Sequence, residues 1–299
     1  MQLLRAWLSP VDPSTNHNIA RKAQHKGTAV WFFRGDFFIE WKSKGSLLWV
    51  HGKRAFLSAL FRLTPSNSLS FSQRALGKAS SGSLFLFHLS QSLSSPSSSI
   101  IEDIMAVCQT GSAIMAYFYF DFRDLNKQSS HDLLLSLVTQ LSTRSSRYCD
   151  ILHHVYETHE KGSRQPSDDT LKVCLKQMLR LPGQGPVFIV LDALDECPDS
   201  SGIQSPRDEV LELVKDLVDL HLEDLHICAT SRPEVDIRAV LEPLAFRSIS
   251  LHDQGGQKTD IEDYVRNVVN LSPSMAMKRW RDDDKNLVIE TLTERADGM

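Results

Sequence analysis

The stretch V-F-I-V-L-D-A-L-D-E-C, residues 187–197, constrains the fold of this chain more than any other. Its five leading apolar residues, three of them β-branched, predict a strand buried on both faces, as in the middle of a parallel sheet. Such strands end at a ligand cleft in open α/β folds. Asp192 could hold a magnesium ion there, and Asp195 and Glu196 could orient or deprotonate water beside a phosphate. The alternative is a solvated acidic turn after an ordinary strand.

Other apolar segments predict the rest of the sheet. They lie near residues 47, 116, 225 and 247, and stretches with helical spacing of apolar residues separate them. Leu133–Leu141 and Leu171–Leu179 show this i, i+3/i+4 spacing. Alternation in Phe246–Leu251 is typical of an edge strand. The chain is therefore predicted to be an α/β protein, with three layers, mostly parallel strands and right-handed crossovers.

Composition excludes several classes of function. The 299 residues are 41% hydrophobic and 23% charged, which is typical of a soluble globular protein. A net charge of −4 provides no basic field for nucleic acid, so we expect no nucleic-acid partner. No apolar run reaches about 18 residues, so we expect no membrane span. The five cysteines are odd in number and form no CxxC pair, which favours reduced thiols in the core over a zinc site or disulfides.

The acidic strand end has a specific resemblance. D-A-L-D-E at residues 192–196 resembles the Walker B element of NACHT-type P-loop NTPases of the STAND class. The resemblance implies that Asp192 holds Mg²⁺ and that Asp195 and Glu196 are the catalytic acids near the attacking water. T-S-R-P-E at residues 230–234 is similar to the sensor 1 element, which makes Arg232 a candidate contact for the γ-phosphate. A surface arginine is the alternative. The family also implies a P-loop NTPase-like sheet of order 5-1-4-3-2.

The segment before this region carries the same resemblance, and then the pattern breaks. D-P-S-T-N, T-A-V-W-F-F and L-L-W-V-H-G resemble fungal NACHT proteins, also described as nephrocystin-3-like N-terminal domains. Gly52 and Lys53 would begin the phosphate-binding loop, G-x-x-x-x-G-K-[ST]. Leu57 and Ser58 stand where its second glycine and lysine should be. The other candidate, Gly77-Lys78, lacks the first glycine and is followed by alanine instead of a hydroxyl residue.

Residues 54–99 differ from the rest of the chain. They hold 15 serines in 46 residues and no Asp or Glu, a composition that predicts a disordered or irregular insert. The family pattern resumes at Ile100, in what should be the later turns of the helix after a phosphate loop. One hypothesis is that a retained intron or shifted reading frame replaced the Walker A loop, and spliced transcript reads that restore the motif would support it. The alternative is a genuine insertion in a pseudoenzyme that binds no nucleotide.

The sequence predicts a division of the chain into three segments, and the family resemblance implies one function. Residues 1–28 are predicted to be a linker and helix, 29–252 the NACHT-like domain, and 253–299 the truncated start of a helical subdomain. The family implies a cytoplasmic signalling switch that uses ATP or GTP with Mg²⁺ and homo-oligomerises with other NACHT chains. Without Walker A we expect defective ATP binding, and hydrolysis stays an open question. Two alternatives remain: a non-catalytic interaction module that keeps the NTPase fold, and a mispredicted gene product.

Overall fold

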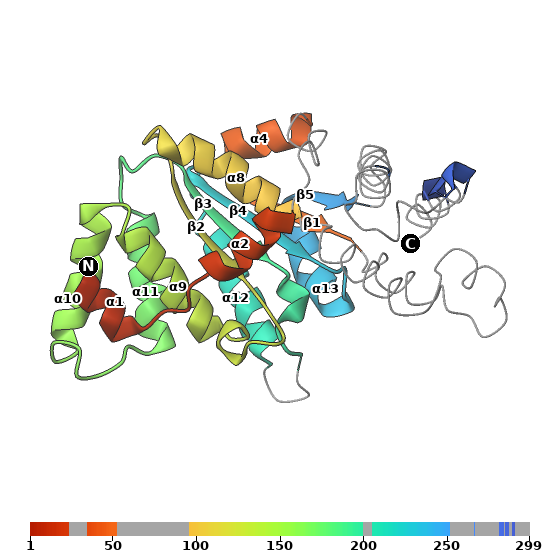
Figure 1. Cartoon of the computed structure of the whole chain (residues 1–299). Coiled ribbons are helices and arrows are strands. Elements are labelled where there is room, and N and C mark those ends of the chain that lie inside the picture. Colours follow the sequence, from red (N-terminus) through yellow and green to blue (C-terminus); the bar gives the residue numbers. More distant parts are fainter. Residues whose placement is uncertain are drawn as a thin grey trace.

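The computed structural model describes residues 1–23, 35–52, 96–199 and 205–251, together with a few positions between 266 and 290. Most of the helical subdomain predicted over residues 253–299 and most of the serine-rich segment 54–99 lie outside the described residues. Lys53 and Gly77-Lys78 lie outside them as well. The two large blocks around the serine-rich segment, 35–52 and 96–251, form one sheet with its covering helices (Figure 1).

The sheet has five parallel strands in the order β2-β3-β4-β1-β5. This is the predicted order 5-1-4-3-2, and the predicted α/β fold class is confirmed. The strands are β1 (Ser46–His51), β2 (Ile114–Tyr119), β3 (Val187–Asp192), β4 (Leu225–Ser231) and β5 (Ala245–Ser250). All of β3 and β4 is buried, whereas β5 at the edge keeps exposed residues, as its alternating sequence predicts.

Alternate residues of the central strands feed two separate cores. Ile189 and Leu191 of β3 face one hydrophobic cluster, whereas Phe188 and Val190 face the other. This follows from the two-residue period of a strand. It explains why β3 is apolar without interruption and why the fold has three layers.

Two groups of helices cover the two faces. α4 (Asp36–Lys44) and α8 (Pro96–Gln109) cover one face, and Figure 1 shows both on the same side of the sheet. The other face is covered by α9 (Ser130–Ser142), α10 (Ser146–Thr158), α11 (Asp168–Leu179), α12 (Pro206–Val218) and α13 (Val235–Leu244). Short 3₁₀ turns, η1 (Leu125–Lys127) and η2 (Leu194–Glu196), follow β2 and β3.

Local sequence signals mark several of the helix ends. Ser205 and Asp208 form a reciprocal capping box at the start of α12, with Pro206 in the first turn. Ser129 caps α9 and Ser167 caps α11 through their hydroxyl groups. α8 begins at Pro96, one turn before the Ile100 at which the family pattern resumes in the sequence.

The turn from α4 into β1 requires a glycine. Gly45 has φ +72°, and a Cβ there would lie 2.4 Å from the carbonyl oxygen of Glu223. A side chain cannot fit against that backbone atom, so Gly45 allows β1 to enter the sheet beside β4.

The N-terminal segment packs onto the domain as two helices, α1 (Gln2–Leu8) and α2 (Ser14–Ala23). Leu4 and Leu8 of α1 join the larger core, and the Trp7 indole donates to the carbonyl of Arg164 at 3.0 Å. α2 lies against α8. The predicted linker therefore includes ordered helices that belong to the packing of the domain.

Candidate functional site at the carboxyl edge of the sheet

The carboxyl ends of the central strands lie together, as a parallel sheet requires. The backbone N–H of Gly52, just after β1, donates to the carbonyl of Ser231 at the end of β4 (3.3 Å). The Trp49 indole also donates to the Ser231 hydroxyl, at 2.9 Å. Asp192 ends β3, one strand further along the sheet. Sequence positions 52, 192 and 231 thus meet at one edge.

Asp192 is buried at this edge, with 5% of its surface exposed. The Thr230 hydroxyl on β4 donates to its Oδ1 atom. The same hydroxyl accepts the backbone N–H of Ala193 at 3.1 Å. Ala193 has φ +55°, and this left-handed residue turns the chain from β3 into η2. Thr230 therefore fixes both the carboxylate and the turn that follows it.

Asp195 and Arg232 form an ion pair across the edge. The Asp195 side chain is 8% exposed, and its Oδ2 atom lies 2.8 Å from Nε of Arg232. Its Oδ1 atom accepts the backbone N–H of Arg232 at 3.0 Å. The structure thus places two predicted site residues together, but in contact with each other. In this arrangement the guanidinium of Arg232 is engaged by a carboxylate.

Arg207, at the start of α12, holds the turn that carries these acids. Its guanidinium donates to the backbone carbonyls of Asp195 (2.9 Å) and Cys197 (3.0 Å), and to Oδ2 of Asp236 on α13 (3.0 Å). The side chain is 11% exposed. Arg207 therefore joins the acidic turn to two helices.

Glu196, the third predicted acid, faces the loop after β2. Its Oε2 atom accepts the backbone N–H of Phe122 at 3.3 Å. In the same loop Asp121 is buried and binds the Arg123 guanidinium through both oxygens, at 2.8 and 2.9 Å. These hydrogen bonds from Arg123 lower the pKa of Asp121 to about 2. The hydrogen bonds to Asp121 and its charge, and to a lesser degree the charge of Glu196, raise the pKa of Arg123.

Asp121 should make the free energy of unfolding depend on pH. Its folded pKa lies below its ordinary value, so its stabilising effect is complete above about pH 4 and is lost as pH falls toward 2. With allowance for the exposed Arg123 side chain, we expect about 1–2 kcal/mol at pH 7. Asp121→Asn should therefore unfold at lower urea concentration at pH 7, with the difference shrinking steadily by pH 2.5. A difference independent of pH would contradict this assignment.

The residues present do not fit a bound nucleoside triphosphate. Asp192 is the type of ligand that Mg²⁺ takes in such a site. The phosphates, however, need the loop G-x-x-x-x-G-K-[ST], and the sequence contains no complete copy of it. Lys53 lies outside the described residues. Across the described part of the chain, no three His, Cys, Asp or Glu side chains converge as a metal site.

The comparison with known families falls on this edge. Residues 94–232 match the family model described as Nephrocystin 3, N-terminal. The match covers a little under half of the chain. It includes Asp192, Asp195, Glu196 and Arg232, whereas Gly52 lies outside it. No curated protein matches the chain.

The sheet includes residues on both sides of the segment that matches this family. β1 and α4 precede the matched segment, yet β1 pairs with β4 over six residues. Trp41 of α4 packs against Phe188 of β3 and His226 of β4, at ring-centroid distances of 5.7 and 5.9 Å. β5 follows the match and pairs with β1. The folded unit therefore extends beyond the segment that resembles the family.

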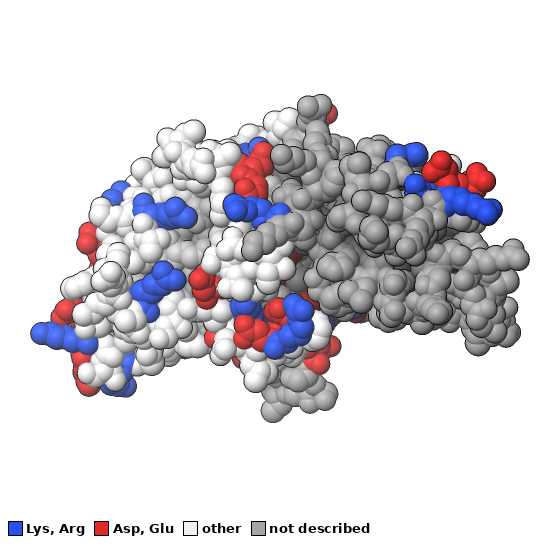
Figure 2. All heavy atoms as spheres, in the orientation of Figure 1, with Lys and Arg blue, Asp and Glu red and all other residues white. Residues whose placement is uncertain are grey.

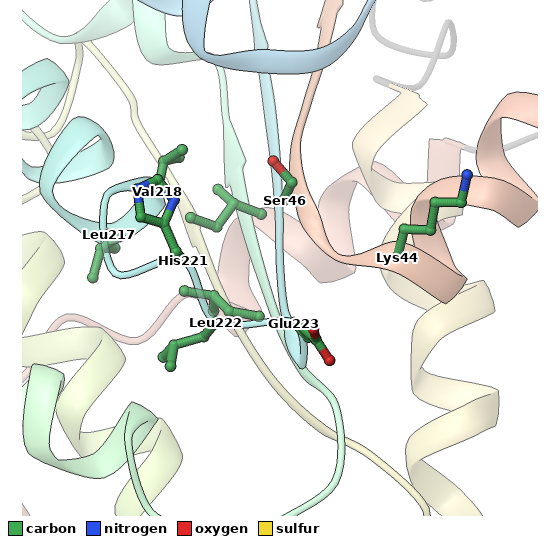
Figure 3. A pocket seen from close by; sticks show the side chains of 9 residues that line it. Lys44, Ser46, Leu217, Val218, His221, Leu222 and Glu223 are labelled. Carbon is green, nitrogen blue, oxygen red and sulfur yellow. The ribbon is translucent and has the colours of Figure 1, made fainter.

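A small cavity lies at the opposite edge of the sheet (Figure 3). Its volume is about 180 Å³, below the range of about 300–1,000 Å³ usual for ligand sites. Lys44 turns its amine toward Glu40, at 2.7 Å. The rest of the lining mixes apolar side chains with Ser46, His221 and Glu223, and it comes from the end of α12, the turn after it and the first residues of β1 and β4. Its place and size separate it from the acidic edge.

The remaining sequence expectations concern solubility and thiols. In the described residues no helix has the length and apolar character to cross a membrane. Lysines and arginines lie among acidic residues on the described part of the face in Figure 2. Cys174, Cys197 and Cys228 are buried, and burial raises the pKa of the first two thiols to about 12. These three cysteines fill the core, as predicted, whereas Cys108 and Cys149 are only partly buried.

Sequence reasoning missed the residues that hold the acids in place. Thr230 and Arg207 both stand in recognisable sequence patterns, because Thr230 lies in the T-S-R-P-E turn and Arg207 in the first turn of α12. Neither pattern specifies the contact that the residue makes. Arg207 contacts Asp195, 12 residues away in sequence, and Thr230 contacts Asp192, 38 residues away. Asn16 and Asp121 are separated by 105 residues, and no local signal links them.

Proposed function

We propose that this chain is a NACHT-type, nucleotide-dependent signalling switch module of the STAND class that is defective in ATP binding as written. The carrying observation is the cluster of Asp192, Asp195 and Arg232 at the carboxyl edge of a 5-1-4-3-2 parallel sheet. This is where open α/β sheets bind ligands. Further support comes from the match to the nephrocystin 3 N-terminal family over the segment that holds all three residues.

In this proposal the ancestral roles divide among the site residues. Asp192 would hold Mg²⁺, Asp195 and Glu196 would act on the attacking water, and Arg232 would sense the γ-phosphate. ATP or GTP would supply the phosphates, and Gly52 and Lys53 would begin the loop that binds them. Assembly with other NACHT chains in the cytoplasm would be the output. The broken loop removes the lysine and hydroxyl on which this chemistry depends.

One observation favours a second function, that of a non-catalytic interaction module. The acidic edge is internally paired: Asp195 binds Arg232, and Asp192 accepts the Thr230 hydroxyl. These contacts satisfy the charged and polar groups without a ligand. A fold stabilised in this way can persist as a binding surface after the phosphate loop is lost.

Equilibrium dialysis with labelled ATP and magnesium tests the proposal. We expect no retention of ATP at micromolar concentrations, because the phosphate-binding loop supplies much of the contact with the phosphates. A micromolar dissociation constant would refute the predicted defect. Transcript reads across residues 54–99 test the related hypothesis of a mispredicted gene product, and uniform coverage would count against it.

Asp192→Asn separates the two functions. If the site still acts, this variant should change nucleotide affinity at millimolar ATP or change self-association measured by light scattering. Asp150→Asn, an exposed acid on α10, is the matched control and should change neither. An Asp192→Asn protein that behaves as the unaltered chain in both assays favours the interaction module.

A further inference from the structure

The helix α2 brings an asparagine to the end of β2. The Asn16 amide nitrogen donates to Oδ2 of Asp121 at 3.3 Å, and its amide oxygen accepts Nζ of Lys127 at 2.8 Å. One neutral side chain thus faces an anion with its donor and a cation with its acceptor. An amide is suited to this position because it carries both groups.

The adjacent His17 fixes α2 in this place. It is 4% exposed, and its ring nitrogens lie 3.1 Å from the Tyr119 hydroxyl and 2.9 Å from Oε1 of Glu102. These partners come from β2 and from α8. Asn16 is therefore held between two fixed elements of the domain, beside the last residue of β2.

The two partners of Asn16 are the two ends of one loop, Asp121–Lys127. The Asp121 N–H donates to the Lys127 carbonyl at 3.3 Å, which closes the loop. Lys127 is 6% exposed, and its amine also lies 3.1 Å from Asp124. Loss of the Asn16 oxygen would leave a buried ammonium with one fewer partner, which is costly. Asn16 therefore clamps the loop shut.

This loop reaches the acidic edge through backbone atoms. The Phe122 N–H donates to Glu196, and the Phe120 N–H just before the loop donates to the carbonyl of Asp192 at 3.0 Å. The position of Phe122 depends on Asp121 beside it. A continuous set of contacts therefore runs from Asn16 through Asp121 to Glu196.

We propose that Asn16 is a positioning residue for the acidic edge, which holds Glu196 in place by clamping the Asp121–Lys127 loop. The functional meaning of this role depends on the proposed nucleotide site, but the coupling itself does not. A movement of α2 would open the loop and release Glu196 from the Phe122 backbone. Through the same contacts, a ligand that draws Glu196 away would loosen α2.

Residue-resolved hydrogen exchange without nucleotide tests the coupling. In Asn16→Ala, exchange of the Phe122, Asp124 and Lys127 amides should rise by roughly tenfold or more, because both hydrogen bonds between Asn16 and charged groups are lost. Asn18→Ala, an exposed asparagine on the same helix, is the matched control and should leave them unchanged. Glu196→Ala gives the rate of the Phe122 amide when its acceptor is absent. Unchanged loop exchange in Asn16→Ala overturns the proposal.

Asn16→Asp provides a second variant with a pH readout. At pH 7.5 its carboxylate faces that of Asp121, so the loop should exchange faster than in the unaltered chain at the same pH. A protonated carboxyl carries a donor and an acceptor, as the amide does. Because an ordinary Asp has a pKa of about 3.9, the excess exchange should shrink as pH is lowered through that value. An excess that does not change with pH overturns the clamp, whereas ATP dialysis alone decides the nucleotide function.

Discussion

Trp41→Ala should destabilise the protein more than any other single truncation considered for this chain, by about 3–5 kcal/mol. The Trp41 side chain is fully buried between α4 and the sheet, beside the rings of Phe38, Phe188 and His226. Its indole N–H donates to the Ser46 carbonyl at 3.0 Å. The variant removes these contacts and leaves a cavity in the smaller core. Urea unfolding should show a midpoint lower by on the order of 2 M.

Two further variants make this result specific. Ile39→Ala alters the same helix at a side chain that is 54% exposed, and should change stability by no more than about 0.5 kcal/mol. Trp41→Phe keeps a ring but loses the bond to Ser46, so its cost should be intermediate. If Trp41→Ala and Ile39→Ala unfold at the same urea concentration, α4 is not part of the folded unit.

This prediction also bears on the extent of the domain. Trp41 precedes the segment that matches the nephrocystin 3 N-terminal family, yet its ring contacts Phe188 of β3 and His226 of the central strand β4. A large loss of stability would therefore show that the cooperative unit includes residues from before the serine-rich segment. It would also count against a chain with no stable fold.

The strand order and the position of the candidate site at the carboxyl edge of the sheet could be predicted, because both follow from the local pattern of apolar residues. The unbroken apolar run Val187–Leu191 specifies a strand buried on both faces, and its place after α11 and before α12 leaves few topologies. The capping residues Ser129, Ser167 and Ser205 mark helix starts because a side-chain hydroxyl there satisfies a free N–H group.

The pairing of the site residues could not be predicted in this way. Sequence placed Asp195 and Arg232 at adjacent strand ends, and the structure brings them into contact at 2.8 Å. Whether two such groups face a ligand or each other depends on the turn at Ala193, whose positive φ is not evident from the sequence. Likewise the role of Asn16 requires knowing that α2 lies beside the end of β2.

Arg207 decides how firmly that turn is held. Its guanidinium donates hydrogen bonds to two backbone carbonyls of the turn and to the carboxylate of Asp236, at 2.9 to 3.0 Å. The carbonyl of Asp195 belongs to the same residue whose carboxylate pairs with Arg232. If Arg207 is lost, the turn is no longer tied to α12, and the geometry of the Asp195–Arg232 pair should loosen with it.

Arg207→Met should therefore cost about 3 kcal/mol, because it leaves two carbonyls of the turn without this donor and Asp236 without its ion pair to Arg207. Urea unfolding measures the loss, and Arg238→Met, an exposed arginine on α13, is the matched control with little expected effect. Asp236→Asn and the double variant complete a mutant cycle that isolates the ion pair. A cost for Arg207→Met no larger than that for Asp236→Asn would mean that the bonds to the turn contribute little. A larger cost, combined with faster exchange of the Arg232 amide that Asp195 accepts, would show that α12 holds the acidic edge in place.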